Sequence, residues 1–316
     1  MSPPGAPGSS GAPGAGGPRV VAIGGGHGLA GTIRATRLYA GYVTAVVTTA
    51  DDGGSTGRLR AGMPGLPAPG DIRRCLEAMV ASDDGQGPLL DAFDYRFPGT
   101  DLEGHPLGNL VLAGLAAVTG DFAVAVEEAS RLLGLDPEVG QVVPATAEPV
   151  HLVARTASGA EVAGESAVSR TEGLHLVGVE RAGAAGGSPP APKAVLDALA
   201  TADQVVLGPG SLYSSVLSAV AVDDVRDAVA GSPGEVVYVC NLRAEVTETQ
   251  GYDVAGHVDA LARHGVMPDV VVVQRGAYPP CALGPGCRVV ESEIVRPHGL
   301  AHDPDKLAAV LSSLLP

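Results

Sequence analysis

Short apolar runs alternate with segments of helical periodicity through most of the chain. Residues 19–23 and 42–48 are rich in β-branched side chains and have the length of buried strands. Between them, apolar residues recur at helical spacing over 29–39. A glycine-rich loop at 24–28 separates the first strand from this helix. The ordered part of the chain is therefore expected to begin with a strand–loop–helix unit.

The same alternation continues after residue 70. We expect helices over 72–81, 107–118, 122–133, 194–200, 252–264 and 305–314, and strands over 204–207, 236–240 and 270–273. A further helix is expected from Leu212, and Asp71 is placed to cap the helix that follows it. Strands that alternate with helices predict an α/β fold with a Rossmann-like, doubly wound and mostly parallel sheet.

Two stretches depart from this alternation. Residues 150–180 contain two short strands joined by a turn at 157–159 and a third strand over 174–179, which predicts a small β-rich insertion. Residues 1–18 are too rich in Pro, Gly and Ala to bury a core and have no apolar run of a signal peptide, so we expect a disordered tail. Residues 19–316 then form one α/β domain.

Composition narrows the class of protein. Hydrophobic residues make up 45% of the 316 residues and aromatic residues only 3%, so Val, Leu and Ala must fill the core, which suits parallel strands covered on both faces. The formal net charge of −15 disfavours binding to nucleic acid. A phosphorylated small ligand is compatible with this charge if the site supplies local positive potential. The acidic surface also serves solubility.

The cysteines and the apolar runs bear on location. None of the four cysteines forms a CxxC pair. Cys281 and Cys287 lie in one Gly/Pro-rich loop and could form a bridge or a metal site, but unpaired thiols in a reducing compartment are the favoured interpretation. No apolar run reaches the roughly 18 residues that a membrane span needs. We therefore expect a cytoplasmic protein.

The predicted sheet places four loops together. Ligands of doubly wound sheets bind beyond the carboxyl ends of the strands. This rule gathers the loops that begin at Gly24, Asp51, Gly208 and Asn241 at one edge. The sequence thus predicts a ligand site at that edge.

The first loop is the strongest local signal. The amides of Gly25, Gly26 and Gly28 are unscreened by side chains, and the helix behind them adds partial positive charge, so the loop is expected to bind phosphate. Gly26, Gly28 and Gly31 also fit G-x-G-x-x-G. The alternative is a tight turn that needs glycine for its backbone conformation.

The second loop carries carboxylates. Asp51 and Asp52 stand at about the distance from the first glycines at which an acid binds ribose hydroxyls in dinucleotide folds. The pair could instead hold Mg²⁺ together with phosphate oxygens. Gly53 and Ser55 continue this loop as ligand-binding candidates. The alternative is a loop whose Asp side chains bond their own backbone.

The remaining candidates lie further along the chain. Gly208, Gly210 and Ser211 repeat the design of the first loop, and the alternative is that Ser211 only caps the next helix. His105 could bond a phosphate or donate a proton, and Asn109 could bind a base or sugar, although a structural role is open for both.

Charge neutralisation is expected from one of three arginines, Arg58, Arg73 and Arg74. Among the patterns of known enzyme classes, we identify no serine-hydrolase elbow, no HExxH metal motif and no Gly-Lys-Ser/Thr phosphate loop.

Long motifs in a fixed order resemble one family. They read IGGGHGLAGTIRATR, VTTADDGGSTGRLR, PGDIRRCLEAM, RFPGTDLEGHPLGNLVLAGL, PATAEPVHL, GESAV, VLGPGSLYSSVL and VYVCNL, and they extend over about 19–273. The chain is identified by them as similar to the YvcK/CofD-like family. The RF-x-x-G-x-x-L-x-G-H-x-x-G-N-L stretch and the GPGSLYSSVL loop favour the YvcK branch.

The resemblance implies two functions. Members of the CofD type transfer a phospholactyl group to a deazaflavin from a nucleotide-activated donor with Mg²⁺, and are related to 2-phospho-L-lactate transferase. Members of the YvcK type are UDP-sugar-binding gluconeogenesis and morphogenesis factors, linked to cell shape and cell-wall control. Two departures stand out: His27 replaces a usual Thr, and segment 243–249 keeps Glu248 and Thr249 of M-T-Q-x-G-E-T but not its Gln and Gly.

Our first hypothesis is a non-catalytic sensor of a UDP-sugar, because the loops offer anion sites and no obvious nucleophile. The amides of Gly25, Gly26, Gly210 and Ser211 would hold the diphosphate. Asp51 or Asp52 would take hydroxyls, with Asn109 and Asn241 fixing the remaining polar edges. Occupancy would act on a regulatory protein partner, with a homo-oligomer as a further option.

A CofD-type transferase is the alternative hypothesis. In that case Asp51 or Asp52 would hold Mg²⁺ or act as general base on the acceptor hydroxyl. An NAD-dependent oxidoreductase is a third hypothesis from the glycine fingerprint, but the Asp-Asp-Gly-Gly loop argues against it.

Overall fold

The computed structural model describes residues 16–81, 87–99, 101–183, 187–281, 283–284, 286–297 and 299–316. The predicted tail falls mostly on residues 1–15, which lie outside the described residues. The carbonyl of Pro18 accepts a hydrogen bond from the amide of Gly41 at 3.0 Å, so the chain is already packed just before the first strand.

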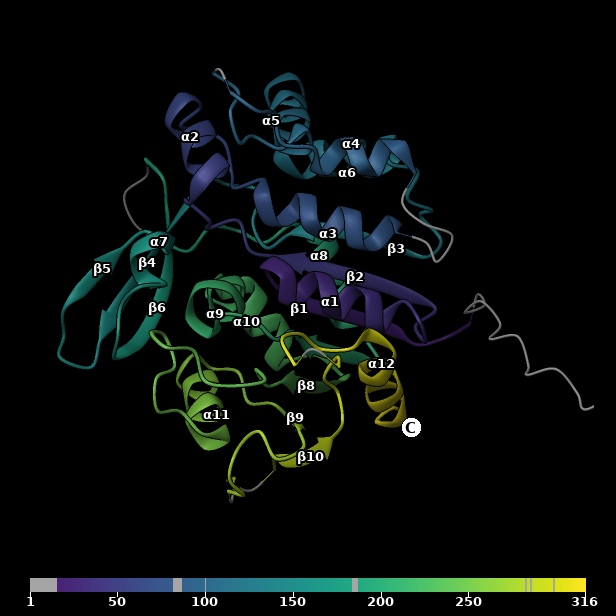
Figure 1. The fold of residues 1–316 in the computed structure, drawn as a ribbon, viewed down its shortest axis with the longest axis vertical. Coiled ribbons are helices and arrows are strands. Elements are labelled where there is room, and N and C mark those ends of the chain that lie inside the picture. The colour runs from purple at the N-terminus through teal and green to yellow at the C-terminus, as the bar shows by residue number, and fades with distance from the viewer. Residues whose placement is uncertain are drawn as a thin grey trace, which may run out of the picture.

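A seven-stranded parallel sheet forms the centre of the molecule (Figure 1). In spatial order its strands are β10 (Arg288–Ser292), β9 (Val270–Gln274), β8 (Glu235–Val239), β7 (Gln204–Leu207), β1 (Arg19–Gly24), β2 (Tyr42–Val47) and β3 (Gly140–Pro144). Every pairing in it is parallel. The prediction of a Rossmann-like, doubly wound sheet is confirmed, although β3 and β10 were not predicted.

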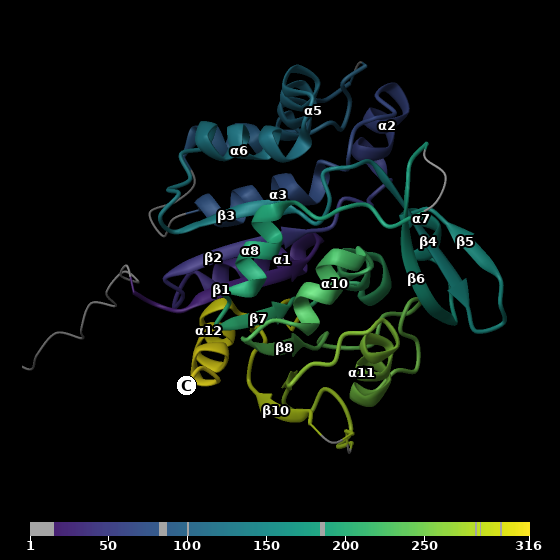
Figure 2. The same ribbon diagram turned by 180° about the vertical axis from the view of Figure 1, so that it is seen from behind.

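Helices cover both faces of the sheet because alternate strand residues point to opposite sides. In β1, Val20 and Ala22 pack into one apolar layer and Val21 and Ile23 into the other. The first layer contains α1 (Gly26–Thr36), α3 (Gly70–Val80), α4 (Pro88–Asp94), α5 (Leu107–Thr119), α6 (Phe122–Leu132) and α12 (Pro304–Ser313). The opposite layer, seen from behind in Figure 2, contains α8 (Lys193–Ala200), the π-helix η1 (Leu212–Val216), α9 (Leu217–Val220), α10 (Asp223–Ala230) and α11 (Val254–Arg263).

A small antiparallel sheet stands beside this body (Figure 1). It consists of β5 (Glu161–Ala163), β4 (Val150–Thr156) and β6 (Leu174–Arg181), so the β-rich insertion is confirmed. The second strand was predicted too long, because the chain turns at Gly164, which has φ +94°, into α7 (Glu165–Val168). The Asp52 carboxylate accepts the amide of Ser166 at 2.9 Å and holds this turn against the main domain.

Two helix starts differ from prediction. Helix α2 (Gly54–Gly62) begins inside what was predicted as a glycine loop. Helix α3 begins at Gly70 after Pro69, and Asp71 lies in its first turn without capping it. The Asp71 carboxylate instead bonds the guanidinium of Arg74 at 2.8 Å and the amide of Gly26. Asp71 therefore links two helix N-termini.

Two further expectations concern thiols and membranes. All four cysteines are free thiols, with Cys75 and Cys240 buried and Cys281 and Cys287 half-buried, as predicted. Among the described residues, no helix combines the length and the apolar character that crossing a bilayer requires.

Candidate functional site

A cavity of about 340 Å³ opens at the carboxyl ends of β1 and β2. Its volume lies in the range of small-molecule sites. The walls come from the loops after both strands, from the first turns of α2 and α3, and from α5, α7 and η1. Five of the predicted ligand-binding residues line it: Gly26, Asp51, Gly53, Ser55 and Asn109.

The glycines of the first loop serve close packing. A side chain on Gly28 would place its Cβ 1.7 Å from the carbonyl oxygen of Pro209, and one on Gly25 would meet the Asp71 carboxylate at 2.6 Å. The amide of Gly26 already donates to Asp71. His27 is exposed and is not among the lining residues. The alternative of a tight turn thus accounts for much of this loop.

The third loop is hydrogen-bonded to the loop that follows β8. The amide of Gly210 donates to Asn241 Oδ1 at 2.8 Å, and Asn241 Nδ2 donates back to the Gly210 carbonyl at 2.8 Å. Gly208 packs against Thr32, whose hydroxyl would lie 3.2 Å from an added Cβ. Gly208, Gly210 and Asn241 are therefore used by the fold and do not line the cavity.

At the start of η1, carboxylate side chains accept the hydrogen bonds that a ligand would otherwise accept. The amides of Tyr213 and Ser214 both donate to Glu248 Oε2, at 2.7 and 3.2 Å. Ser211 does not cap this helix, because its hydroxyl donates to Glu245 Oε1 at 2.9 Å. Of the two amides of this loop that we expected to hold a diphosphate, that of Gly210 thus already donates to Asn241, and neither Gly210 nor Ser211 lines the cavity.

The two aspartates of the second loop have separate partners. Asp51 Oδ1 accepts the amide of Gly53 at 2.9 Å, and Asp51 lines the cavity. Asp52 caps α7 through Ser166 and is not a lining residue. In the part of the chain that the structure describes, no group of three or more His, Cys, Asp or Glu side chains is arranged to hold a metal. Of the two candidate magnesium ligands, only Asp51 therefore lines the cavity.

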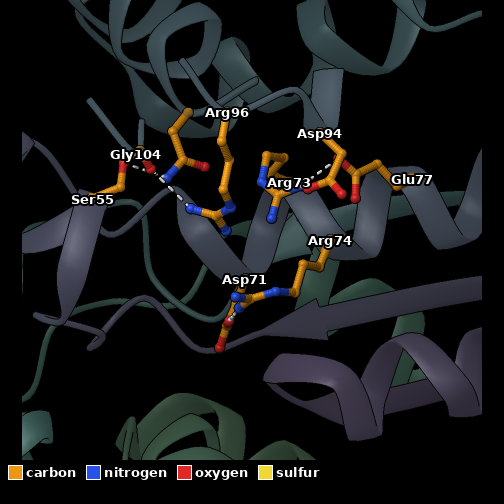
Figure 3. Close-up of polar contacts among 9 residues, drawn as sticks. Ser55, Asp71, Arg73, Arg74, Glu77, Asp94, Arg96 and Gly104 are labelled. Atoms are coloured by element: carbon orange, nitrogen blue, oxygen red, sulfur yellow. Dashed lines mark hydrogen bonds and ion pairs between the residues drawn. The ribbon is translucent and has the colours of Figure 1, made fainter. Parts of the chain in front are cut away.

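Three arginines line the cavity, and Figure 3 shows them with their polar contacts. Arg73 is 2% exposed and is neutralised by Glu77 and Asp94, at 2.5 and 2.6 Å. Arg74 pairs with Asp71. Arg96 donates to the carbonyl of Gly104 at 2.9 Å.

No carboxylate of the described residues pairs with Arg96 within salt-bridge distance. Arg96 therefore brings unbalanced positive charge to the mouth of the cavity. Arg58, the third arginine of the prediction, donates to the Glu103 carbonyl and does not line the cavity.

Carboxyl groups face these arginines. Burial, and then the charge of Asp51, raises the pKa of Asp71. Burial, followed by the charges of Asp51, Asp52 and Glu248, raises the pKa of Glu165 to about 7. Glu165 is thus partly protonated at neutral pH, which lowers the negative charge that a phosphate would meet.

A hydrogen-bonded chain connects the second loop to α5. Ser55 Oγ lies 2.7 Å from His105 Nδ1, and Asn109 Nδ2 donates to Ser55 Oγ at 3.1 Å. His105 and Asn109 are 6% and 2% exposed. Burial, and secondarily the charge of Arg58, lowers the pKa of His105. Asn109 Oδ1 is buried and has no hydrogen-bond partner in the described structure.

Several lining residues escaped the sequence prediction. Arg96, Glu165, Ser214 and Ser215 were not proposed as ligand contacts, and Asp71 was proposed only as a helix cap. The signal was present, because these residues lie inside the RFPG, GESAV, GPGSLYSS and PGDIRR motifs. Motif membership did not show which side chain of each motif faces the cavity.

Comparison with known proteins places these features in one group. Residues 20–298 match the CofD family, described as 2-phospho-L-lactate transferase CofD. A "Putative gluconeogenesis factor" of Thermoanaerobacterium thermosulfurigenes is 36% identical over 322 residues, which cover 95% of this chain and 97% of that protein. Another of the same name from Nostoc sp. is 43% identical over 246 residues, 78% of this chain. The match spans only about half (52%) of the Nostoc protein.

A solved structure agrees with the fold. The crystal structure of a UPF0052-family protein from Bacillus halodurans superimposes with a TM-score of 0.82 at 32% identity. The match covers 93% of this chain and 98% of that one.

Proposed function

The chain belongs to the CofD family, and we propose that it is a gluconeogenesis factor whose cavity binds a UDP-sugar. The observation that carries the proposal is the arrangement of opposite charges across one cavity. Arg96, Arg74 and Asp51 all line this cavity. Guanidinium groups suit phosphate oxygens, and carboxylates suit the hydroxyls of ribose and sugar.

The polar groups of α5 extend the same recognition. Asn109 Oδ1 is a buried acceptor without a partner in the described structure. An N–H or O–H group of the ligand would satisfy it, and leaving such an atom unpaired costs about 1–3 kcal/mol. An acetamido or hydroxyl substituent of the sugar supplies that donor. The sugar end of the ligand is therefore assigned to the α5 side of the cavity.

We further propose that the protein acts in the cytoplasm as a sensor that regulates cell shape or cell-wall metabolism. Glu165 reaches the cavity from α7, which is attached to the small sheet. Ligand contact with Glu165 would bias the position of that sheet and thereby the binding of a regulatory protein partner or of a second copy.

Calorimetry with purified protein tests the binding. UDP-N-acetylglucosamine is expected to bind with a dissociation constant on the order of 10 µM, and free N-acetylglucosamine not detectably, because the diphosphate supplies the charge contacts. UDP should retain part of the affinity. Absence of heat at a large excess of UDP-N-acetylglucosamine, with a folded protein, would refute the proposal.

One observation favours a second function, a CofD-type transferase. Glu165, with a pKa near neutrality, lines the same cavity as Asp51. Such a carboxyl is suited to general acid–base work on a deazaflavin hydroxyl that attacks a phospholactyl donor. Formation of the phospholactyl deazaflavin from the nucleotide donor, lost on Asp51→Ala, would establish this function. No step is assigned to magnesium, because only Asp51 of the two aspartates lines the cavity.

A further inference from the structure

The turn that carries Ser55 has the pattern of a nucleophile loop. Gly53–Gly57 reads G-x-S-x-G, although sequence analysis identified no serine-hydrolase elbow, and the turn follows the end of β2 at Val47 only after several residues. Two positions of this turn, Gly54 and Gly57, require glycine in the structure. Gly54 has φ +45°, and a Cβ on Gly57 would lie 2.1 Å from the carbonyl oxygen of Asp52.

The hydroxyl of Ser55 lies between two polar side chains. Asn109 Nδ2 donates to Ser55 Oγ, and Ser55 Oγ lies 2.7 Å from His105 Nδ1. In the tautomer that carries its proton on Nε2, His105 accepts the Ser55 hydroxyl hydrogen at Nδ1. A hydroxyl that donates to an oriented imidazole is the arrangement of an activated nucleophile. Burial lowers the pKa of His105, which favours the neutral imidazole that can accept a proton.

The surroundings of Ser55 match an attack on phosphorus. Ser55 lies in the first turn of α2 and lines the cavity, where the helix N-terminus favours negative charge. Arg96 supplies positive charge that no described carboxylate neutralises, which suits the oxygens of a phosphoryl group. Glu165 lines the same cavity and can give a proton to a leaving oxygen.

We propose that Ser55 is a nucleophile activated by His105, and that it attacks the phosphorus of a phosphate ester or anhydride held in the cavity. The Ser55 proton passes to His105 Nδ1 as the Oγ–P bond forms. The bond from phosphorus to the leaving oxygen breaks, and that oxygen keeps the electron pair and takes a proton from Glu165. This activity goes beyond ligand sensing, because a UDP-sugar could bind here whether or not Ser55 reacts.

A fluorophosphonate probe tests the proposal on the full chain. Its phosphorus bonds to a nucleophilic serine with loss of fluoride, so labelling needs no knowledge of the natural ligand. We expect one label per chain by intact mass, located on Ser55 by peptide mapping and absent from Ser55→Ala. His105→Asn should slow labelling about 100-fold, the contribution of a general base. Ser130→Ala and His151→Asn, away from the cavity, are matched controls and should label like the unchanged protein.

The pH dependence separates activation from a structural role. Labelling should fall as the pH drops through the pKa of His105, below 6.5, and this fall should disappear in His105→Asn. If His105→Asn does not fold, Ser55→Cys alkylated by iodoacetamide gives the same pH comparison with His105 in place. An unlabelled Ser55 in folded protein, or equal labelling rates with and without His105, would overturn the proposal. Calorimetric binding of the UDP-sugar is independent of either result.

Discussion

The second and third glycine loops are similar in sequence and opposite in use. Both follow an interior strand and precede a helix, and both contain Gly and Ser. Around Gly210, Asn241 and Glu248 already accept or donate to the backbone. Around Ser55, the loop opens into a cavity of about 340 Å³.

The difference teaches that glycine content does not measure the availability of amides. What decides is whether acceptors from elsewhere in the chain reach the loop first. In the third loop they come from a segment about thirty residues further on, which a local motif cannot reveal. In the second loop the Asp51 carboxylate accepts from its neighbour Gly53, and the cavity keeps its polar lining.

The packing role of the first and third loops gives the largest expected effect. Gly28→Ala should lower the free energy of unfolding by about 3 kcal/mol, because its Cβ would lie 1.7 Å from the Pro209 carbonyl oxygen. Gly31→Ala is the matched control in the same helix, since nothing lies within 4 Å of its added Cβ. It should stabilise by about 0.5–1 kcal/mol through helix propensity. Urea titration measures the free energy of unfolding of both variants. Equal changes in the two would contradict the close contact between Gly28 and Pro209.

The cavity side of the comparison predicts a loss of binding. Arg96→Ala should weaken binding of UDP-N-acetylglucosamine about 30-fold, or 2 kcal/mol, because it removes a cation facing the phosphates. Stability should hardly change, since Arg96 is exposed and donates to a single carbonyl. Calorimetry checks the affinity, with Arg131→Ala on the exposed face of α6 as control. Unchanged affinity in Arg96→Ala would mean that the phosphates lie elsewhere.

A substitution in the third loop should lower stability and leave ligand affinity nearly unchanged, which is the reverse of the effect expected for Arg96→Ala. Asn241→Ala leaves both polar groups of Gly210 without partners and should cost about 1.5 kcal/mol of stability. UDP-sugar affinity should stay within about twofold, because the loop does not contribute amides to the cavity. Asn241→Asp keeps the oxygen that accepts from the Gly210 amide, so its stability should lie between those of the unchanged protein and Asn241→Ala. A large loss of affinity at full stability would restore this loop to the ligand site.

The smallest effect is a dependence of stability on pH. Glu165 keeps its proton up to about pH 7 in the folded chain but only to about 4.5 when unfolded. Between these values the folded state binds more protons, so the contribution of Glu165 to stability is lost as pH rises from about 5 to 7. Glu165→Gln should remove the loss, on the order of 1 kcal/mol after solvent screening. Unfolding midpoints of the unchanged protein and of Glu165→Gln at pH 5 and 8 measure this loss. An equal change in midpoint at both pH values would contradict the raised pKa of Glu165.

Much of the fold follows from local pattern. The apolar strands β1, β2, β7, β8 and β9 are evident because buried parallel strands are continuous β-branched runs. β10 escaped prediction because it is an edge strand, half-exposed and interrupted by charged residues. β3 is a second edge strand that begins at Gly140 and ends at Pro144, which gives it the appearance of a loop.

The site was predictable only in part, for a different reason. Asp51, Ser55 and Asn109 could be selected from their motifs, and the structure brings them to one cavity. Whether an amide is vacant, or an arginine neutralised, depends on partners distant in sequence. Asp94 neutralising Arg73 and Glu248 capping η1 are such cases. No periodicity or composition encodes them.

The contact between Gly28 and Pro209 also determines the order of folding during translation. β1 lies inside the sheet, and its neighbour β7 is translated only after the whole small sheet. A nascent chain that has completed β2 therefore still presents one unpaired, apolar edge of β1. Until Pro209 and the strand before it leave the ribosome, the amino-terminal half is a substrate for chaperones or for misassociation with other nascent chains.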